Sequence, residues 1–211
     1  MDPYQTTFET WDKLAELYYE KFSAIRIYDE TYNLFCSLIP KEQSSVLEIG
    51  CGPGNVTRYL MDHRPDLKIT GLDVAPTMID YARKMVPEAQ FDVLDIRDLH
   101  LMNGKFDGIF NGFCLPYQSK KDLQKFLLDS ASLLNQNGIV YLSCIEGDYE
   151  QSGMETGSKP EYRMQVFYYS ESALRKALSE TGFETISVSR IAYPSADDSK
   201  QVHLIIQATK K

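Results

Sequence analysis

The chain has 211 residues, of which 43% are hydrophobic and 25% charged, and this balance excludes a disordered or fibrous protein. Its length suits a single globular domain with a substantial core. The net charge of −8 argues against nonspecific binding to nucleic acid or to an anionic membrane, because both require clustered cations. The four cysteines are spread without a Cys-x-x-Cys pair, so neither a disulfide scaffold nor a zinc knuckle is predicted. With no N-terminal signal pattern and no apolar run long enough for a membrane span, we expect a cytoplasmic protein.

The N-terminal part of the chain has a helical pattern. Apolar residues recur there at steps of three and four, which predicts an amphipathic helix with an aromatic face. These positions are Phe8, Trp11, Ala15, Tyr18 and Phe22. A second helical stretch, 30–38, is stopped by Pro40. We therefore expect 1–40 to form a helical lid segment on a main domain of 41–211, with no linker that divides the chain further.

After Ser45 the pattern changes to short apolar runs that alternate with helical segments, which is typical of a parallel α/β sheet. The expected strands are 45–49, 68–73, 89–93, 106–111 and 138–144, and the expected helices are 55–63, 76–86 and 119–135. A last helix is predicted over 170–181, with Ser170 as its N-cap and Gly182 just beyond its end. Two strands, 183–192 and 201–209, then form an antiparallel hairpin at the C-terminus.

The stretch 46–54, Val-Leu-Glu-Ile-Gly-Cys-Gly-Pro-Gly, is the most informative motif. An apolar strand there runs into a tight glycine turn and a helix start, an order that exposes backbone N–H groups to a small polar ligand. The next strand ends at Asp73, a carboxylate able to bind a ribose diol. The Gly-x-Gly-x-Gly spacing differs from the dinucleotide pattern Gly-x-Gly-x-x-Gly, and no Lys or Ser/Thr follows as in a P-loop. The two motifs together predict a nucleoside-binding site.

Further landmarks follow in order along the chain. They are Gly71-Leu72-Asp73-Val74-Ala75-Pro76-Thr77-Met78-Ile79, Phe91-Asp92-Val93-Leu94-Asp95-Ile96, Phe106-Asp107-Gly108-Ile109-Phe110-Asn111 and the approach to a fifth strand over 133–142. With these, the sequence resembles the class I (seven-stranded) S-adenosylmethionine-dependent methyltransferases. The resemblance implies a three-layer, Rossmann-like α/β fold. Its seven-stranded sheet would be mostly parallel, with a C-terminal antiparallel hairpin strand and helices on both faces.

The resemblance also implies which residues hold S-adenosylmethionine. Gly50, Cys51 and Gly52 would lie against its methionine portion, where a bulky side chain would obstruct it. Asp73 would bind the ribose hydroxyls, with a helix-capping role as the alternative. Glu48 would contact the cofactor directly or through water, or else orient the glycine turn.

The remaining cofactor residues implied by the resemblance surround the adenine and the amino group. Val74 and Met78 would form an apolar shelf for the adenine, although Met78 is equally suited to core packing. Asp95 and Ile96 would recognise the adenine edge. Asn111, at the end of the fourth strand, would hold the cofactor's amino group or form a turn.

The region after the fourth strand limits the acceptor. Residues 111–117 lack the Asn/Asp-Pro-Pro-aromatic motif of amino-methylating nucleic-acid enzymes, and no glutamate pair follows as in protein-arginine enzymes. No set of carboxylates suggests a divalent metal, so none is expected. Aromatic residues remain, and they suit a pocket for a small organic acceptor. The candidates for its wall are Tyr18, Tyr19, Phe113 and Tyr117.

Methyl transfer from a sulfonium is an in-line displacement that alignment and desolvation can accelerate without a base. If the acceptor were an amine or a phenol, a proton acceptor would help, and Tyr19, Tyr117 and Glu146 are the candidates. The three histidines receive no role from the sequence.

Several alternatives stay open at this point. The chain could be a catalytically silent S-adenosylmethionine-binding module, a methyltransferase of a macromolecule or a nicotinamide-dependent oxidoreductase, because fold alone does not determine function. Whether the protein is a monomer or a homodimer is not decided by the sequence.

Overall fold

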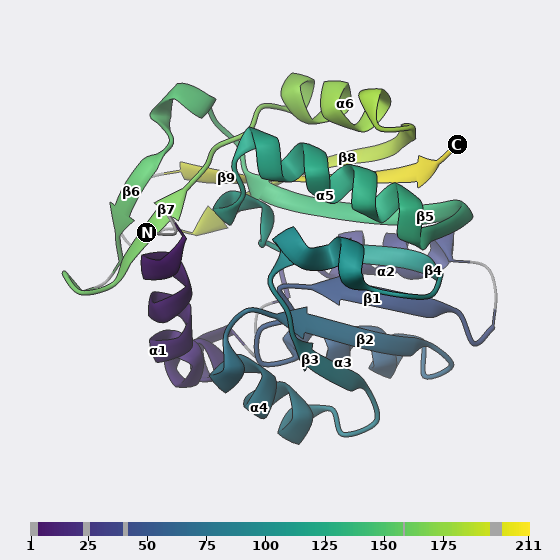
Figure 1. The fold of residues 1–211 in the computed structure, drawn as a ribbon, viewed down its shortest axis with the longest axis horizontal. Helices are drawn as coiled ribbons and strands as arrows, with labels where there is room; N and C mark the ends of the chain where they lie inside the picture. Colours follow the sequence, from purple (N-terminus) through teal and green to yellow (C-terminus); the bar gives the residue numbers. More distant parts are fainter. Residues whose placement is uncertain (1–3, 23–25, 40–41, 158, 195–199) are drawn as a thin grey trace.

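Seven strands form one mixed sheet in the order β3-β2-β1-β4-β5-β9-β8 in the computed structural model (Figure 1). The structure describes residues 4–22, 26–39, 42–157, 159–194 and 200–211. The strands are β1 (Ser45–Ile49), β2 (Lys68–Asp73), β3 (Gln90–Val93), β4 (Phe106–Asn111), β5 (Leu134–Ile145), β8 (Phe183–Pro194) and β9 (Lys200–Lys210). Strands β1 to β5 pair in parallel, whereas β9 is antiparallel to both β5 and β8. The predicted Rossmann-like fold class is confirmed.

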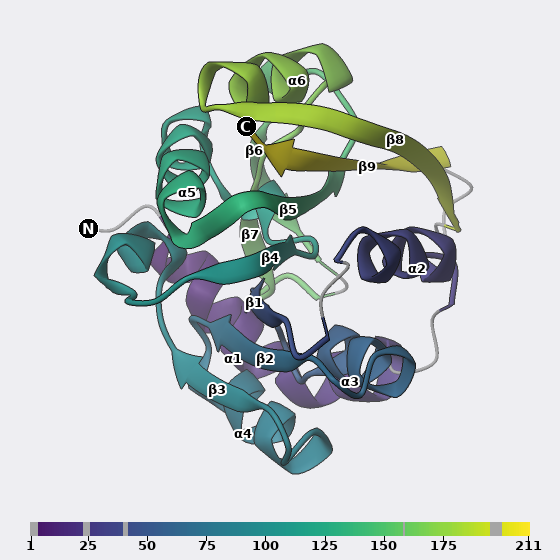
Figure 2. The same ribbon diagram turned by 90° about the vertical axis from the view of Figure 1, so that its right-hand side faces the viewer.

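Helices cover both faces of the sheet (Figure 2). The helices α2 (Asp29–Leu38), α3 (Asn55–His63) and α4 (Pro76–Met85) lie on one side, and α5 (Lys120–Leu133) and α6 (Glu171–Glu180) lie on the other. Although α2 belongs to the segment 1–40, it packs into the core. Phe35 on α2 is fully buried, and its ring meets Phe110 of β4 edge-on at 5.1 Å between ring centroids.

Short elements complete the chain. They are three 3-10 helices, η1 (Ile96–Leu101), η2 (Leu115–Tyr117) and η3 (Tyr149–Gln151), and a two-stranded hairpin of β6 (Gly153–Thr156) and β7 (Arg163–Val166). This hairpin was not predicted from the sequence. Its strands are four residues each and only Val166 is buried, so they carry little hydrophobic alternation.

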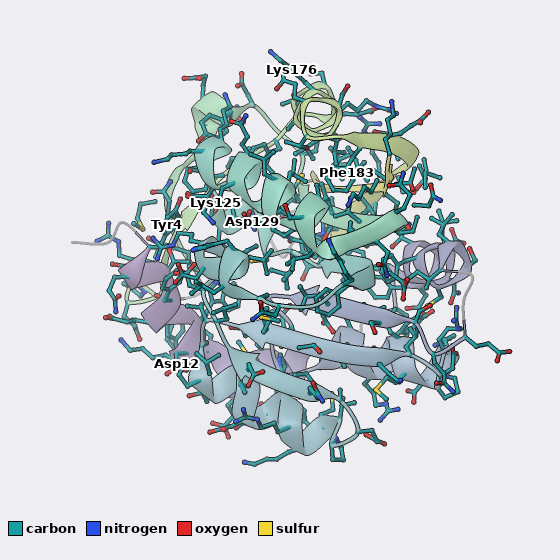
Figure 3. All side chains as sticks on the ribbon, turned by 45° about the vertical axis from the view of Figure 1, so that its right-hand side comes forward. Tyr4, Asp12, Lys125, Asp129, Lys176 and Phe183 are labelled. Carbon is teal, nitrogen blue, oxygen red and sulfur yellow. The ribbon has the colours of Figure 1, made fainter. Side chains whose placement is uncertain are left out.

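Helix α1 (Gln5–Phe22) lies with the β6–β7 hairpin at the carboxyl ends of the parallel strands (Figure 1). Three contacts attach it there. Asp12 accepts a hydrogen bond of 2.9 Å from the backbone N–H of Thr77 on α4, and Thr7 accepts one of 2.9 Å from Gln165 on β7. The hydroxyl of Tyr4 donates to Asp122 of α5. Figure 3 labels Tyr4, the residue before α1, and Asp12 on α1. Helix α1 therefore bridges α4, β7 and α5 across the edge of the sheet where open α/β folds bind ligands.

The predicted cap of α6 is confirmed, and it yields a test of local stability. The Ser170 hydroxyl accepts a hydrogen bond of 3.3 Å from the backbone N–H of Ala173. We expect Ser170→Ala to lower the free energy of unfolding by about 1 kcal/mol, because the N–H loses its partner. For a domain of this size that corresponds to a fall of roughly 2–4 °C in Tm by calorimetry. Ser179→Ala, at an exposed position of the same helix, should leave the Tm nearly unchanged.

Candidate active site

A cavity of about 360 Å³ opens at the carboxyl edge of the sheet. Its lining extends from Asp73 on β2 and Asp95 after β3, past the glycine turn after β1, to Tyr193 on β8 and His203 on β9. Aromatic residues of α1 line it as well. One cavity thus joins the predicted nucleoside site to a second, aromatic half.

The glycine turn after β1 has a backbone that other residues adopt only with strain. Gly50, Gly52 and Gly54 have φ angles of +62°, +53° and +91°. A Cβ on Gly50 would lie 2.8 Å from the Cβ of Cys114, so a side chain there collides with the loop after β4. A Cβ on Gly52 would meet only the Tyr18 ring among the described atoms within 4 Å, at 3.8 Å. Gly52 therefore borders open space inside the cavity.

The Asp73 carboxylate is bound to the backbone on both sides. One oxygen accepts from the N–H of Gly52 at 2.9 Å and the other from the N–H of Ala75 at 2.9 Å. Burial raises the pKa of this carboxyl, and the backbone hydrogen bonds from Ala75 and Gly52 oppose the rise. Each carboxylate oxygen retains lone-pair capacity for one further donor. Asp73 thus fixes the glycine turn and still presents acceptors to the cavity.

Glu48 lies beneath the same turn and is only 2% exposed. One of its oxygens accepts a hydrogen bond of 2.5 Å from the Thr57 hydroxyl on α3. Burial raises the pKa of Glu48 to about 8, which the Thr57 hydrogen bond partly offsets. The raised pKa favours the protonated form, which can donate a hydrogen bond into the cavity.

In the half of the cavity that contains Asp73, the residues predicted to surround the adenine also line the cavity. They are Val74, Met78 and Ile96. Asp95 lines the cavity too, but its carboxylate forms a double contact with Arg97, at 3.0 Å to Nε and 2.5 Å to a terminal nitrogen. Asp95 also accepts from the Arg97 N–H at 2.9 Å and so caps η1. The carboxylate proposed to read the adenine edge is therefore already ion-paired in this structure.

The other half of the cavity has aromatic walls. The indole of Trp11 lies edge-on to the rings of Tyr18 and Tyr117, each at 5.4 Å between centroids. Burial raises the pKa of Tyr18 to about 12 and that of Tyr117 well above its usual range, so both hydroxyls stay protonated. Phe113 lies in the loop after β4 and has a φ of +57°. Its backbone N–H donates a hydrogen bond of 2.8 Å to the Ser143 hydroxyl. Tyr18, Phe113 and Tyr117 all line the cavity.

Three other candidate residues are not among the described residues that line this cavity. Tyr19 is about 100° further round α1 than Tyr18, and its ring stacks on Tyr81 of α4 at 5.3 Å. Glu146 is ion-paired with Arg190 at 2.6 Å. Asn111 is fully buried, and its side-chain N and O atoms have no hydrogen-bond partner among the described residues. Tyr19 and Glu146 are therefore poorly placed as proton acceptors.

Sequence reasoning gave no polar role to three residues of the aromatic half: Tyr28, Gln201 and His203. Tyr28 precedes α2, and the other two lie at the start of β9. Because β9 is antiparallel to its neighbour β5, its first residues reach the carboxyl edge of the sheet. The only signal in the sequence was the predicted C-terminal hairpin, which did not specify this register.

The cavity has the features that a bound nucleoside requires. Its glycine turn leaves space where a side chain would intrude, and Asp73 offers two acceptors. In addition, Asn55 and Gln118 line the cavity, and each has a buried side-chain oxygen with no hydrogen-bond partner in the described chain. A buried acceptor of this kind is costly unless a ligand or water satisfies it. Groups of three or more His, Cys, Asp or Glu that could hold a metal were not found among the described residues.

Gly52 gives a test of whether the cavity binds a ligand close to the turn. We expect Gly52→Ala to lower affinity for S-adenosylhomocysteine about tenfold, because the methyl group projects into the cavity. The positive φ should also lower stability by about 1 kcal/mol. Isothermal titration calorimetry measures the first effect and urea unfolding the second. Gly104→Ala also introduces positive-φ strain, at a turn outside the cavity lining, so it should lose stability but keep its affinity.

Comparison with known proteins agrees with the geometry. The family described as "Methyltransferase domain" matches residues 46–138, which run from β1 into β5. The chain is 34% identical to a malonyl-[acyl-carrier protein] O-methyltransferase of Acetivibrio thermocellus over 49% of its own length and 36% of that protein. It is 31% identical to the trans-aconitate 2-methyltransferase of Escherichia coli over 70% of its length and 59% of that protein. The chain thus spans less than two thirds of these relatives.

Solved structures show the same fold over almost the whole chain. A complex of DhpI with S-adenosylhomocysteine aligns with a TM-score of 0.75 at 18% identity, over 98% of this chain and 96% of that one. The 1,6-didemethyltoxoflavin-N1-methyltransferase of Burkholderia thailandensis aligns with a TM-score of 0.73 at 18% identity, over 98% and 88%. Residues 46–138 thus match the methyltransferase family, and nearly the whole chain shares its Rossmann-like fold with solved methyltransferases. Among the described helices, none has the length and apolar character needed to cross a membrane.

Proposed function

We propose that this protein is an S-adenosylmethionine-dependent methyltransferase that acts on a small molecule. The observation that carries the proposal is the continuity of the cavity. The same cavity contains the strained glycine turn, the Asp73 carboxylate and an aromatic half lined by Trp11, Tyr18 and Tyr117.

The cofactor half fits S-adenosylmethionine residue by residue. Asp73 would accept hydrogen bonds from the ribose hydroxyls, and Gly50 and Gly52 would let the methionine portion approach the backbone. Val74, Met78 and Ile96 would enclose the adenine. When bound there, the cofactor supplies an electrophilic methyl group on a positively charged sulfur. Rings close to that cation, such as those of Tyr18 and Tyr117, would stabilise its charge.

A small acceptor is favoured by the size and the walls of the cavity. Its volume of about 360 Å³, which the cofactor and the acceptor would share, lies at the lower end of the range for small-molecule sites. The rings of Trp11 and Tyr117, together with α1 across the opening, would orient the acceptor and exclude water. By name, two related proteins act on small molecules, trans-aconitate and 1,6-didemethyltoxoflavin. The segment 1–40 would act as the lid only through α1, because α2 packs into the core.

The proposal is tested in two steps. Calorimetric titration should show micromolar binding of S-adenosylmethionine and S-adenosylhomocysteine but none of NADH; a preference for NADH would favour the oxidoreductase. Incubation with methyl-labelled cofactor and a metabolite extract passed through a 1 kDa filter should then yield labelled small products. Binding without any transfer would favour the silent module, and label recovered only on protein or RNA would favour a macromolecular acceptor.

A further inference from the structure

A buried hydrogen-bonded pair, Tyr28 and His203, lies in the aromatic half of the cavity and has no part in the cofactor site. His203 is 6% exposed and Tyr28 is 8% exposed, and both line the cavity. His203 pairs in register with Ile145, the last residue of β5, which also lines the cavity. The pair thus lies at the carboxyl edge beyond β4 and β5, on the side of the cavity away from Asp73.

The hydrogen bonds of the pair define the protonation of the imidazole. The Tyr28 hydroxyl is 2.6 Å from His203 Nδ1, and His203 Nε2 is 3.2 Å from the side-chain oxygen of Gln201. An amide oxygen only accepts hydrogen bonds, so Nε2 carries the hydrogen. Nδ1 is then the acceptor, and the Tyr28 hydroxyl donates to it. This leaves the lone pairs of the Tyr28 oxygen available to accept a hydrogen bond from a ligand.

The surroundings keep the imidazole neutral. Its ring stacks on Tyr193 of β8 at 4.6 Å and meets Phe113 at 4.5 Å between centroids. Burial lowers the pKa of His203 to about 4 and raises the pKa of Tyr28 well above its usual range. Among the described residues, the other titratable or charged groups around the pair are Tyr18, Tyr32, Tyr193 and Arg26, which also line the cavity. None of these groups is an anion at neutral pH, so His203 is neutral before the reaction and able to accept a proton.

We propose that the Tyr28–His203 pair is the catalytic proton acceptor for an acceptor molecule with a hydroxyl or ring N–H nucleophile on an uncharged aromatic framework. The inference rests on the proposed function. As the nucleophilic atom forms its bond to the methyl carbon, the carbon–sulfur bond breaks and its electron pair stays on sulfur. The proton of the nucleophile passes to the Tyr28 oxygen, and the Tyr28 proton passes to His203 Nδ1, from which it is later released to water.

Other candidate bases in the structure are less suitable. Glu146 is held by Arg190, and Tyr19 stacks outside the cavity on Tyr81. Tyr117 lines the cavity, but the structure gives it no partner comparable to His203 that would take its proton onward among the described residues. The pair also fits an uncharged acceptor better than a carboxylate, which is already deprotonated at neutral pH and needs no base.

The first test reads the protonation of His203 without any turnover. With only three histidines in the chain, long-range ¹H–¹⁵N spectra of ¹⁵N-histidine-labelled protein can be assigned with the His63→Asn and His100→Asn variants. We expect His203 to be neutral from pH 5.5 to 8, with hydrogen on Nε2. Tyr28→Phe should shift the Nδ1 resonance and leave Nε2–H in place. An Nδ1–H tautomer, or an imidazolium at pH 7, overturns the proposal.

The second test measures transfer to defined probes. With S-adenosylmethionine, we expect methylation of 2-naphthol or benzimidazole, and a loss of about 10²–10⁴-fold in kcat/KM for His203→Asn. The same substitution at the exposed His100 is the matched control and should keep wild-type activity. Affinity for S-adenosylhomocysteine should be unchanged in both. Turnover of trans-aconitate alone, or equal activity of His203→Asn and wild type, overturns the pair as proton acceptor. Failure of the wild type to bind the cofactor instead contradicts the proposed function.

Discussion

Asp73→Asn is expected to lower the affinity for S-adenosylmethionine by at least about 100-fold. The carboxylate accepts backbone hydrogen bonds from both Gly52 and Ala75, at 2.9 Å each. An asparagine amide can satisfy only one of these donors and turns its own NH₂ against the other. The variant would lose a charge-assisted bond to the glycine turn as well as acceptors for the ribose. Two such losses, at about 1.5 kcal/mol or more each, correspond to the expected 100-fold effect.

The measurement is calorimetric titration with S-adenosylmethionine and S-adenosylhomocysteine. Asp92→Asn is a matched control, because Asp92 lies on the neighbouring strand β3 with its side chain exposed. The control should bind like the wild type. Unfolding of both variants should remain cooperative, which separates a local defect from loss of the fold. An Asp73→Asn protein that binds within threefold of the wild type would show that the ribose is not held at this position.

The cofactor half could be read from the sequence because its residues are local in the chain. The glycine turn immediately follows β1, Asp73 ends β2 and Ile96 follows β3, so the parallel order brings them to one edge. All these strands were expected close to their observed bounds. What the sequence did not reveal was the partner of Asp95, which is Arg97, two residues later in the chain.

The acceptor half depends on contacts between distant parts of the chain, and prediction was poorer there. Tyr28 and His203 are hydrogen-bonded although 175 residues separate them. Glu146 is paired with Arg190, 44 residues later on β8. Tyr18 and Tyr19 are neighbours in the sequence, yet the helix turns only the first toward the cavity. No periodicity in a single sequence encodes such pairings, so residue type suggested the aromatic wall but not its polar centre.

Glu48 predicts an unusual dependence of stability on pH. In the unfolded chain its carboxyl titrates near the ordinary 4.5, whereas burial raises the folded-state pKa to about 8. Between these values the folded protein binds the proton more tightly than the unfolded chain. The stabilisation is therefore fully present below pH 4.5, and it is lost as the pH rises to about 8. At about 1.4 kcal/mol per pKa unit, the total change is on the order of 3–5 kcal/mol.

The Glu48→Gln variant keeps the shape and removes the titration. We compare the free energy of unfolding of the variant with that of the wild type. This difference, variant minus wild type, should rise by about 3 kcal/mol between pH 4.5 and pH 8.5. The measurement is urea unfolding of both proteins from pH 4.5 to 8.5. The contribution of His203 to the pH dependence is present in both and cancels in the difference. That contribution has the opposite slope, because burial lowers the pKa of His203 to about 4. Glu16→Gln, at an exposed position of α1, should retain the wild-type slope. A flat difference curve would mean that Glu48 is ionised in the folded protein, and that it meets the cofactor as an acceptor and not as a donor.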